Sequence, residues 1–368
     1  MSDDDLRVSG IATAYRLYDV GYEIDLERVN ALLGADIRGR SVPVRAEGRA
    51  FEIRQPPLSA TLGERDVQVD GRPYRAVFGA RFFDFGVCSL RLTVTATAPC
   101  SWEEFIAFGT AFDASAVLAP LFQNELDVLL ERVRPAIERP RLAPVVEDYV
   151  VFRLHSIEQG GTPVLGSEAL GDDHLVPLLL GEQRRLASPA RRELLGNRFS
   201  YYADDLAVLT WDNALVVEPR ADDQDVELVL EFANAQLLEL RVYDALLDSE
   251  LPALYDRIAA TRRRLQLSRT FRGLLGSVQA RVADVTEIVE RAENAFKVTD
   301  DVYLARIYEK ALELFRERSW RSGISRKLAI FRETYEMLNG EAQAARAELL
   351  ELAIVLLIVF EIVLSFIR

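Results

Sequence analysis

Apolar and polar residues alternate with a period of two in several segments of the first 220 residues. In the segment 87–95 every second residue is apolar, namely Cys88, Leu90, Leu92 and Val94. This is the pattern of a strand with one buried face. Segments 149–157 and 205–219 alternate in the same way, and Asp212-Asn213 is expected to form a hairpin turn. The first part of the chain is therefore predicted to contain a β-sheet.

Helical patterns are interleaved with these strands. Ser101 and Glu104 have the spacing of a capping box at a helix start. The next helix, which Pro135 ends, is predicted by one apolar stripe: Leu118, Phe122, Leu126, Leu129 and Val133. Near the N-terminus a strand leads into a helix that Gly34 stops, whereas the glycine-rich segment 155–177 is expected to be an insertion or a loop. The mixture predicts an α+β fold with a mixed or antiparallel sheet, for which we expect a ferredoxin-like arrangement.

After Pro219 the pattern is helical almost to the end of the chain. The first apolar series, in which Pro252 is expected to bend or restart the helix, is Leu240, Tyr243, Leu247, Leu251, Leu254 and Ile258. The second, before a turn predicted at 299–301, is Phe271, Leu275, Val278, Val282, Val285, Val289, Ala292 and Phe296. The third is Ile324, Leu328, Phe331, Tyr335, Leu338, Ala342, Ala345, Leu349 and Leu352. Spacings of three and four predict long antiparallel coiled-coil-like helices, with an ordinary helical bundle as the alternative.

The last apolar stretch has the length of one membrane span. Leu349 to Ile367 would form a helix of about 28 Å, against a hydrocarbon thickness of about 30 Å. Glu351 would lie near the headgroups, and Glu361 would cost on the order of 2 to 3 kcal/mol, which its apolar neighbours offset. We expect a tail anchor, so the predicted parts are a head (1–219), a helical stalk (220–348) and a transmembrane helix (349–367). The alternative is a soluble oligomer that buries this helix.

Composition narrows the classes of partner and compartment. The formal charge is −14, with 58 acidic and 44 basic residues, so wholesale binding to a phosphate backbone is disfavoured and no DNA partner is expected. Cys88 and Cys100 are the only cysteines, which rules out a disulfide framework and favours a reducing compartment. The acidic N-terminus has no secretory pattern, so the head is expected in the cytoplasm.

Three stretches resemble a known family. The end of the chain resembles the closing signature of the required-for-meiotic-nuclear-division family, also called domain of unknown function 155 or YagE-like, at Leu350, Glu351, Ile354, Leu357, Ile358 and Glu361. Further similarity lies upstream at Phe85, Gly86, Val87, Ala233, Asn234, Ala235, Gln236, Leu240, Tyr243, Asp244 and Leu247. Departures occur at Glu231 and Phe232, where the family has Ser-His, and at Leu352, where it has Trp.

On this resemblance the chain is identified as a divergent bacterial member of that family. The resemblance implies a membrane-anchored protein without known catalysis. Because mitochondrial relatives support translation, it also implies a protein or ribosomal partner. With the tail anchor, the expected location is the bacterial inner membrane, in a single pass with the N-terminal domain cytoplasmic.

Motifs for chemistry are lacking. His155 and His174 have no partner at metal-ligand spacing, and Asp172, Asp173 and His174 are at most a weak cation site. The sequence contains no phosphate loop, dinucleotide-binding glycine motif or nucleophile elbow. We therefore assign no catalytic, cofactor-binding or metal residues and expect no cofactor.

Two basic clusters stand out from the acidic background. Arg257 to Arg272 contains six arginines, and Arg316 to Arg332 contains six bases with one acid. The hypothesis is that at least one of them faces anionic headgroups or a polyanionic partner such as ribosomal RNA, with a solvated bundle end as the alternative. The predicted function is a membrane-anchored interaction or scaffold protein that forms a homo-oligomer, in which Glu361 is shielded by helix association. A membrane-tethered enzyme with a site in the head is the alternative.

Overall fold

The chain divides into two compact units, residues 1–242 with 291–318 and residues 243–290 with 319–368. The computed structural model describes residues 6–40, 51–53, 55–97, 99–182, 184, 186–220, 223–262, 276, 280, 283, 296–298 and 302–367. The first unit contains the start of helix α7 (Asp225–Arg262) and helix α9 (Val302–Leu314), both of which the sequence had placed in the stalk.

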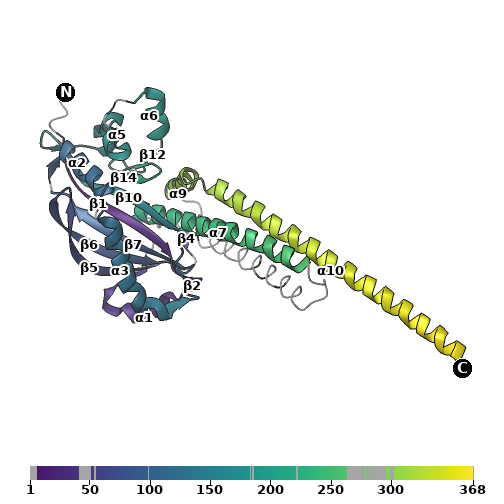
Figure 1. Cartoon of the computed structure of the whole chain (residues 1–368). Coiled ribbons are helices and arrows are strands. Elements are labelled where there is room, and N and C mark those ends of the chain that lie inside the picture. The colour runs from purple at the N-terminus through teal and green to yellow at the C-terminus, as the bar shows by residue number, and fades with distance from the viewer. Residues whose placement is uncertain are drawn as a thin grey trace. The chain divides into compact units, whose positions relative to one another are not determined.

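The first unit is built on one large sheet (Figure 1). Its strands follow in the order β12 (Arg198–Phe199), β13 (Leu206–Leu209), β14 (Asn213–Val217), β10 (Val146–Gln159), β1 (Leu6–Asp19), β7 (Val87–Thr95), β6 (Arg72–Phe82), β5 (Leu58–Val69) and β3 (Ile37–Arg40). Strands β10 and β14 run parallel, and the other described neighbours on this path are antiparallel. The predicted α+β fold is thus confirmed.

The centre of the sheet has the connectivity of a smaller motif. With α1 (Leu26–Leu33) and α2 (Trp102–Asp113), the strands β1, β6, β7 and β10 follow along the chain as β-α-β-β-α-β, the order of elements in a ferredoxin-like unit. Strands β3 and β5 extend one edge, and β14, β13 and β12 extend the other. The sheet is therefore larger than the arrangement that we expected.

Short strands complete the unit. They are β2 (Glu23–Ile24) with β9 (Ile137–Glu138), β4 (Phe51–Ile53) with β15 (Phe296–Val298), β8 (Cys100–Ser101) beside β1, and β11 (Thr162–Pro163) beside β10. Phe296, predicted as the last member of the second coiled-coil series, lies in β15 and pairs with Ile53. The other members of that series lie outside the described residues.

Helices α2 and α3 (Leu118–Val133) cover the apolar face of the sheet (Figure 1). The capping box is confirmed, because the Ser101 hydroxyl accepts from the amide of Glu104 and the Glu104 carboxylate accepts from the amide of Ser101. The predicted stripe of α3 is buried throughout. Its Phe122 ring meets Phe78 of β6 edge-on at 5.6 Å between centroids. One large apolar core results.

The glycine-rich segment 155–177 is not the loop that we predicted. Gly160 and Gly161, both at positive φ, turn β10 into a hairpin with β11. Helices α4 (Gly166–Ala169) and α5 (Asp172–Leu180) follow, and α6 (Ser188–Leu194) precedes β12. Apolar residues of α5 are buried against the core, which the high glycine content of the segment had obscured.

Helix α10 (Glu317–Ile367) makes up much of the second unit. Ile324, Leu328 and Phe331 are buried, as the third apolar series predicts. The side chains of Tyr335, Leu338, Ala342, Ala345 and Leu349 lie outside the described set, so the coiled coil stays a prediction. Helix α7 continues through Pro252 without the predicted restart.

From Leu350 to Val363 the side chains of α10 are exposed on every side of the helix. Within the described part of the chain, however, no single helix combines the length and the apolar composition of a membrane span. Among the described residues, one pair of helical segments reaches those values together, Trp102–Asp113 and Leu118–Ala136, which are bent by 58°. The predicted span also includes the side chains of Leu349 and of residues 364–367, which are not described.

Candidate functional site

A polar surface covers the second face of the central sheet. In β7, Leu90 and Leu92 belong to the apolar core, so the alternation of a strand directs Arg91 and Thr93 to the opposite face. The register places Arg91 between Tyr15 of β1 and Gly79 of β6. In the sequence, the residues of this face appear only as the polar positions of the alternating pattern, so the pattern did not mark them as a site.

A cavity of about 900 Å³ lies over this face. Its lining combines four arginines, four hydroxyl-bearing side chains, a tyrosine and one carboxylate: Arg38, Arg81, Arg91, Arg153, Thr13, Ser59, Thr61, Thr93, Tyr15 and Glu227. Most of these residues come from strands of the sheet, and Glu227 comes from the first turn of α7. In a chain of net charge −14, such a concentration of arginine is a local reversal of sign.

Arg81 is held by a buried ion pair. Its guanidinium donates through Nη1 to Glu231 of α7 and through Nε to the Ser59 hydroxyl at 3.2 Å. The side chains of Arg81 and Glu231 are only 5% and 0% exposed, so both charges have lost their water. Burial lowers the pKa of Arg81, and Glu231 partly offsets that effect. The pair fixes α7 to the sheet beside the cavity.

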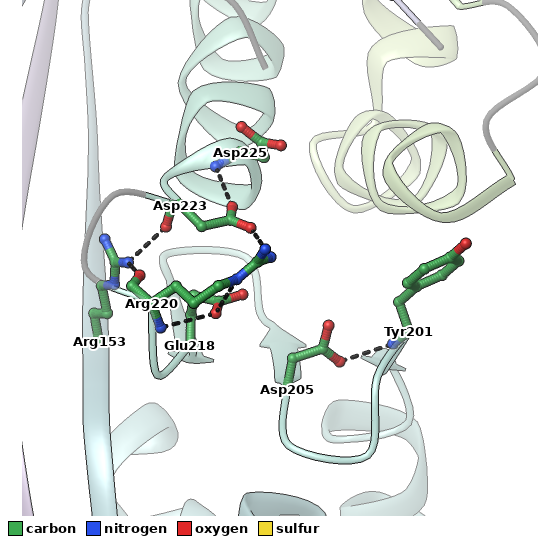
Figure 2. A network of polar contacts seen from close by, with 7 residues as sticks. All are labelled: Arg153, Tyr201, Asp205, Glu218, Arg220, Asp223 and Asp225. Carbon is green, nitrogen blue, oxygen red and sulfur yellow. Dashed lines mark hydrogen bonds and ion pairs between the residues drawn. The ribbon is translucent and has the colours of Figure 1, made fainter. Parts of the chain in front are cut away.

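Arg153 joins β10 to the start of α7 (Figure 2). Its Nη2 donates to the backbone carbonyls of Arg220 and Asp223, and Nη1 lies 3.4 Å from Glu227. Figure 2 also shows the Asp223 carboxylate accepting from the amide of Asp225, where α7 begins. The side chain of Arg153 is therefore fixed on several sides, which makes it a rigid part of the cavity wall.

Further ion pairs hold the loop before α7 in place (Figure 2). Arg220 pairs with Asp223 and with Glu218, whose carboxylate also accepts from the Arg220 amide at 3.0 Å. In the neighbouring loop the Asp205 carboxylate accepts from the Tyr201 amide at 2.7 Å. The contacts of Arg220 hold the loop that leads into the first turn of α7, which carries Glu227.

Two further residues of the cavity, Tyr15 and Glu227, have a shifted pKa. Burial raises the pKa of the Tyr15 hydroxyl, and Glu231 raises it further. Burial also raises the pKa of Glu227, against the opposing effect of Arg153. Tyr15 is therefore a hydrogen-bond donor at neutral pH. The buried Nε atoms of Arg91 and Arg153 have no hydrogen-bond partner among the described residues. Arg91 differs from Arg81 and Arg153 because only the latter two form ion pairs with carboxylates of α7 in the described part of the chain.

Glu147 of β10 and Arg241 of α7 form a third ion pair between the sheet and α7. Burial raises the pKa of Glu147 to about 7, although Arg241 lowers it in part. When folding raises the pKa of an acid, the protonated form of that acid favours the folded state. This contribution to stability is complete below the pKa of the unfolded state, and it is lost as pH rises through the pKa of the folded state. For Glu147 the window extends from about pH 4.5 to about pH 7.

We expect Glu147→Gln to flatten the pH dependence of stability in this window. Between pH 5 and pH 7.5 the wild type should lose on the order of 2 kcal/mol of unfolding free energy relative to the variant. Urea denaturation at the two pH values measures the difference. Glu138→Gln, at an acid whose side chain is 53% exposed, is the control and should follow the wild type. Parallel pH profiles for wild type and Glu147→Gln would contradict the assignment.

The two histidines and the acidic turn lie outside this cavity's lining. Burial lowers the pKa of His155 on β10, and His174 in α5 meets the Trp102 ring edge-on at 6.4 Å. Asp172 and Asp173 pair with Arg198 and Arg191 at 2.8 and 2.7 Å. The described residues contain no group of acidic, histidine or cysteine side chains suited to a metal ion. Cys88 and Cys100 are free and buried.

Some bases of the second predicted cluster have partners within their own unit. The guanidinium of Arg316 lies 5.5 Å from the centre of the Trp211 ring. Lys327 pairs with Asp244 and Asp248 at 2.7 and 2.6 Å. The side chains of the cluster Arg257 to Arg272 lie outside the described residues. Interactions inside the chain thus account for part of the second cluster.

The fold and the cavity define an α+β protein with an arginine-lined cavity between the sheet and the start of α7. Residues 9–224 match the family described as "Uncharacterized protein MJ0711, N-terminal domain", and the chain belongs to this family. An archaeal relative, "Uncharacterized protein MJ0711" of Methanocaldococcus jannaschii, is 26% identical over 192 residues. The aligned region covers 52% of this chain and 58% of the relative, so the chain spans little more than half of that relative's length. No solved structure matches the chain.

This family match corrects the resemblance drawn from the sequence. The chain belongs to the MJ0711 family and not to the required-for-meiotic-nuclear-division family or its bacterial branch. The positions that suggested the latter are mostly apolar residues of helices, whose types recur in any buried or membrane-facing helix. Asn234 and Gln236, for example, are buried on α7, where Asn234 donates to the carbonyl of Leu230.

Proposed function

We propose that the chain is a membrane-anchored interaction protein, with its α+β head held near a bilayer by the end of α10. The observation that supports the proposal is the exposed apolar surface from Leu350 to Val363, where exposed fractions reach 67% at Leu357 and 64% at Phe360. Within that stretch Glu351 and Glu361 are the charged residues. Apolar surface of this extent is costly in water and favourable in lipid.

The proposed anchor crosses once, between Leu349 and Ile367, and leaves the head on the cytoplasmic side. Glu361 would then lie inside the hydrocarbon region, where helix association can shield a carboxyl group from lipid. A homo-oligomer follows from this reading. A protein or ribosomal partner for the head stays a prediction. The alternative in which a soluble oligomer buries this surface makes the opposite prediction for membrane extraction.

Alkaline carbonate extraction of membranes separates these proposals. We expect the full chain to stay in the washed membranes, and a chain ending at Glu348 to appear in the soluble fraction. Ile358→Arg, at the centre of the segment, should release most of the full chain, because arginine costs about 2.5 to 3.5 kcal/mol at a helix centre. Leu350→Arg is the matched control near the headgroups and should remain bound.

Each outcome of the extraction has a meaning. If the full chain and Leu350→Arg remain while the truncated chain and Ile358→Arg are released, the anchor stands. Complete extraction of the full chain, together with a high oligomeric state that the truncation lowers, would replace the anchor by the soluble oligomer. The cavity under α7 is an observation that favours the enzyme alternative, since charged groups converge in it. It does not define a reaction.

A further inference from the structure

We propose that the arginine-lined cavity binds a small molecule that carries a phosphate monoester. The proposal goes beyond membrane anchoring and does not depend on it. It rests on two guanidinium groups without a carboxylate partner among the described residues, on the space that Gly79 leaves for one of them, and on the size of the cavity.

The charge balance favours a dianion. Of the four lining arginines, Arg81 is paired with Glu231 and Arg153 with Glu227. Within the described part of the chain, Arg38 and Arg91 have no carboxylate partner; Arg38 donates through Nε to the Thr61 hydroxyl at 2.8 Å. Two positive charges therefore remain. A phosphate monoester carries close to two negative charges at pH 7, and arginine binds phosphate through two parallel hydrogen bonds.

Gly79 leaves room for the guanidinium of Arg91 to lie against β6. The register of β5, β6 and β7 sets Gly79 between Thr61 and Arg91. A Cβ atom at Gly79 would lie 3.2 Å from Nη2 of Arg91 and 3.2 Å from the Ala60 carbonyl oxygen. With no side chain there, the guanidinium of Arg91 lies low over β6, and Arg38 approaches from the other side through Thr61. The phosphate is placed in the cavity beside the guanidinium groups of Arg91 and Arg38.

Other lining groups suit the rest of the ligand. Thr13, Thr93 and Tyr15 add hydroxyl groups to the same face, and the raised pKa of Tyr15 keeps its proton available. A volume of about 900 Å³ is far larger than one phosphate ion and lies within the usual range of ligand pockets. The cavity thus has space for the organic part of a phosphorylated metabolite or of a lipid headgroup.

Calorimetric titration of the full chain in mild detergent at pH 7.5 tests the proposal, with glycerol 3-phosphate as the probe. We expect saturable binding that Arg91→Gln weakens at least tenfold. Gly79→Ala should also weaken binding, although it changes no charge, because its methyl group would displace the guanidinium of Arg91. Arg75→Gln, on the same strand β6 but with a side chain that is 76% exposed, is the matched control and should keep wild-type affinity.

Thermal unfolding without ligand checks that each variant is folded before titration. Short-chain phosphatidic acid, titrated in the same way, separates the two sources of the ligand: tighter binding of the lipid identifies a headgroup, and tighter binding of glycerol 3-phosphate identifies a free metabolite. Either order supports a phosphate site if it depends on Arg91. The proposal is overturned if neither compound binds more than sodium chloride of equal ionic strength does, or if Arg91→Gln binds as the wild type.

Discussion

Glu231→Gln is expected to lower the free energy of unfolding by about 3 to 5 kcal/mol. The substitution keeps the shape of the side chain and removes its charge, which leaves the Arg81 guanidinium buried without a counterion. Arg81 and Glu231 lie 150 residues apart in the chain and join β6 to α7. The loss therefore acts on the contact that holds α7 against the sheet.

Urea denaturation at pH 7 measures this effect, and two comparisons give it meaning. Glu64→Gln breaks the ion pair between Glu64 and Arg75, whose side chains are 49% and 76% exposed respectively. It should lower the free energy of unfolding by less than about 1 kcal/mol. The double variant Arg81→Met with Glu231→Leu removes both buried charges and should regain much of the stability that the single variant loses. Equal losses in Glu64→Gln and Glu231→Gln would show that the buried pair has no special role.

The local features of the head were predictable because each depends on a few neighbouring residues. The alternation at 87–95, the capping box at Ser101 and the stripe of α3 all specify one element with one buried face, and the structure has them. The turn at Asp212 joins β13 to β14, with the Thr210 amide donating to the Asn213 carbonyl. Short-range spacing contains the whole signal in these cases.

The cavity could not be predicted in the same way. Arg81, Arg91 and Arg153 occupy polar positions of three strands that alternate, and such positions usually face solvent. Only the order of the strands brings the three arginines together, and only the placement of α7 supplies the carboxylates that pair with Arg81 and Arg153. The available sequence signal was weak: charged residues recur on one face of strands whose neighbours are strongly apolar.

The family assignment failed for a related reason. Most of the positions that suggested it are apolar residues or small residues in helices, so they describe helix packing more than ancestry. The family match instead covers residues 9–224, which is the sheet and its helices up to the residue before α7. One of the quoted positions, Gly86, has a structural requirement of its own.

Gly86 closes the connection between β6 and β7. Its φ of 99° lies in the region that favours glycine, its carbonyl accepts from the amide of Val20 at 3.0 Å, and the Phe83 amide donates to the Val87 carbonyl across the same turn. A Cβ atom at Gly86 would lie 2.1 Å from the carbonyl oxygen of Gly21. Backbone cannot move away as a flexible side chain can, so the segments 20–22 and 83–87 would have to separate.

Gly86→Ala is therefore expected to cost about 3 to 5 kcal/mol, the sum of an unfavourable backbone conformation and a steric overlap in a packed region. Gly71→Ala separates the two contributions. Gly71 also has a positive φ, 71°, in the turn between β5 and β6, but no atom lies within 4 Å of its Cβ position. That variant should lose only about 1 to 2 kcal/mol. The unfolding free energies of the two variants, taken from their melting curves, are compared. The difference between their losses measures the steric cost of a methyl group where Gly86 approaches Gly21. Equal losses would mean that the backbone at this turn relaxes and removes the overlap at no cost in stability.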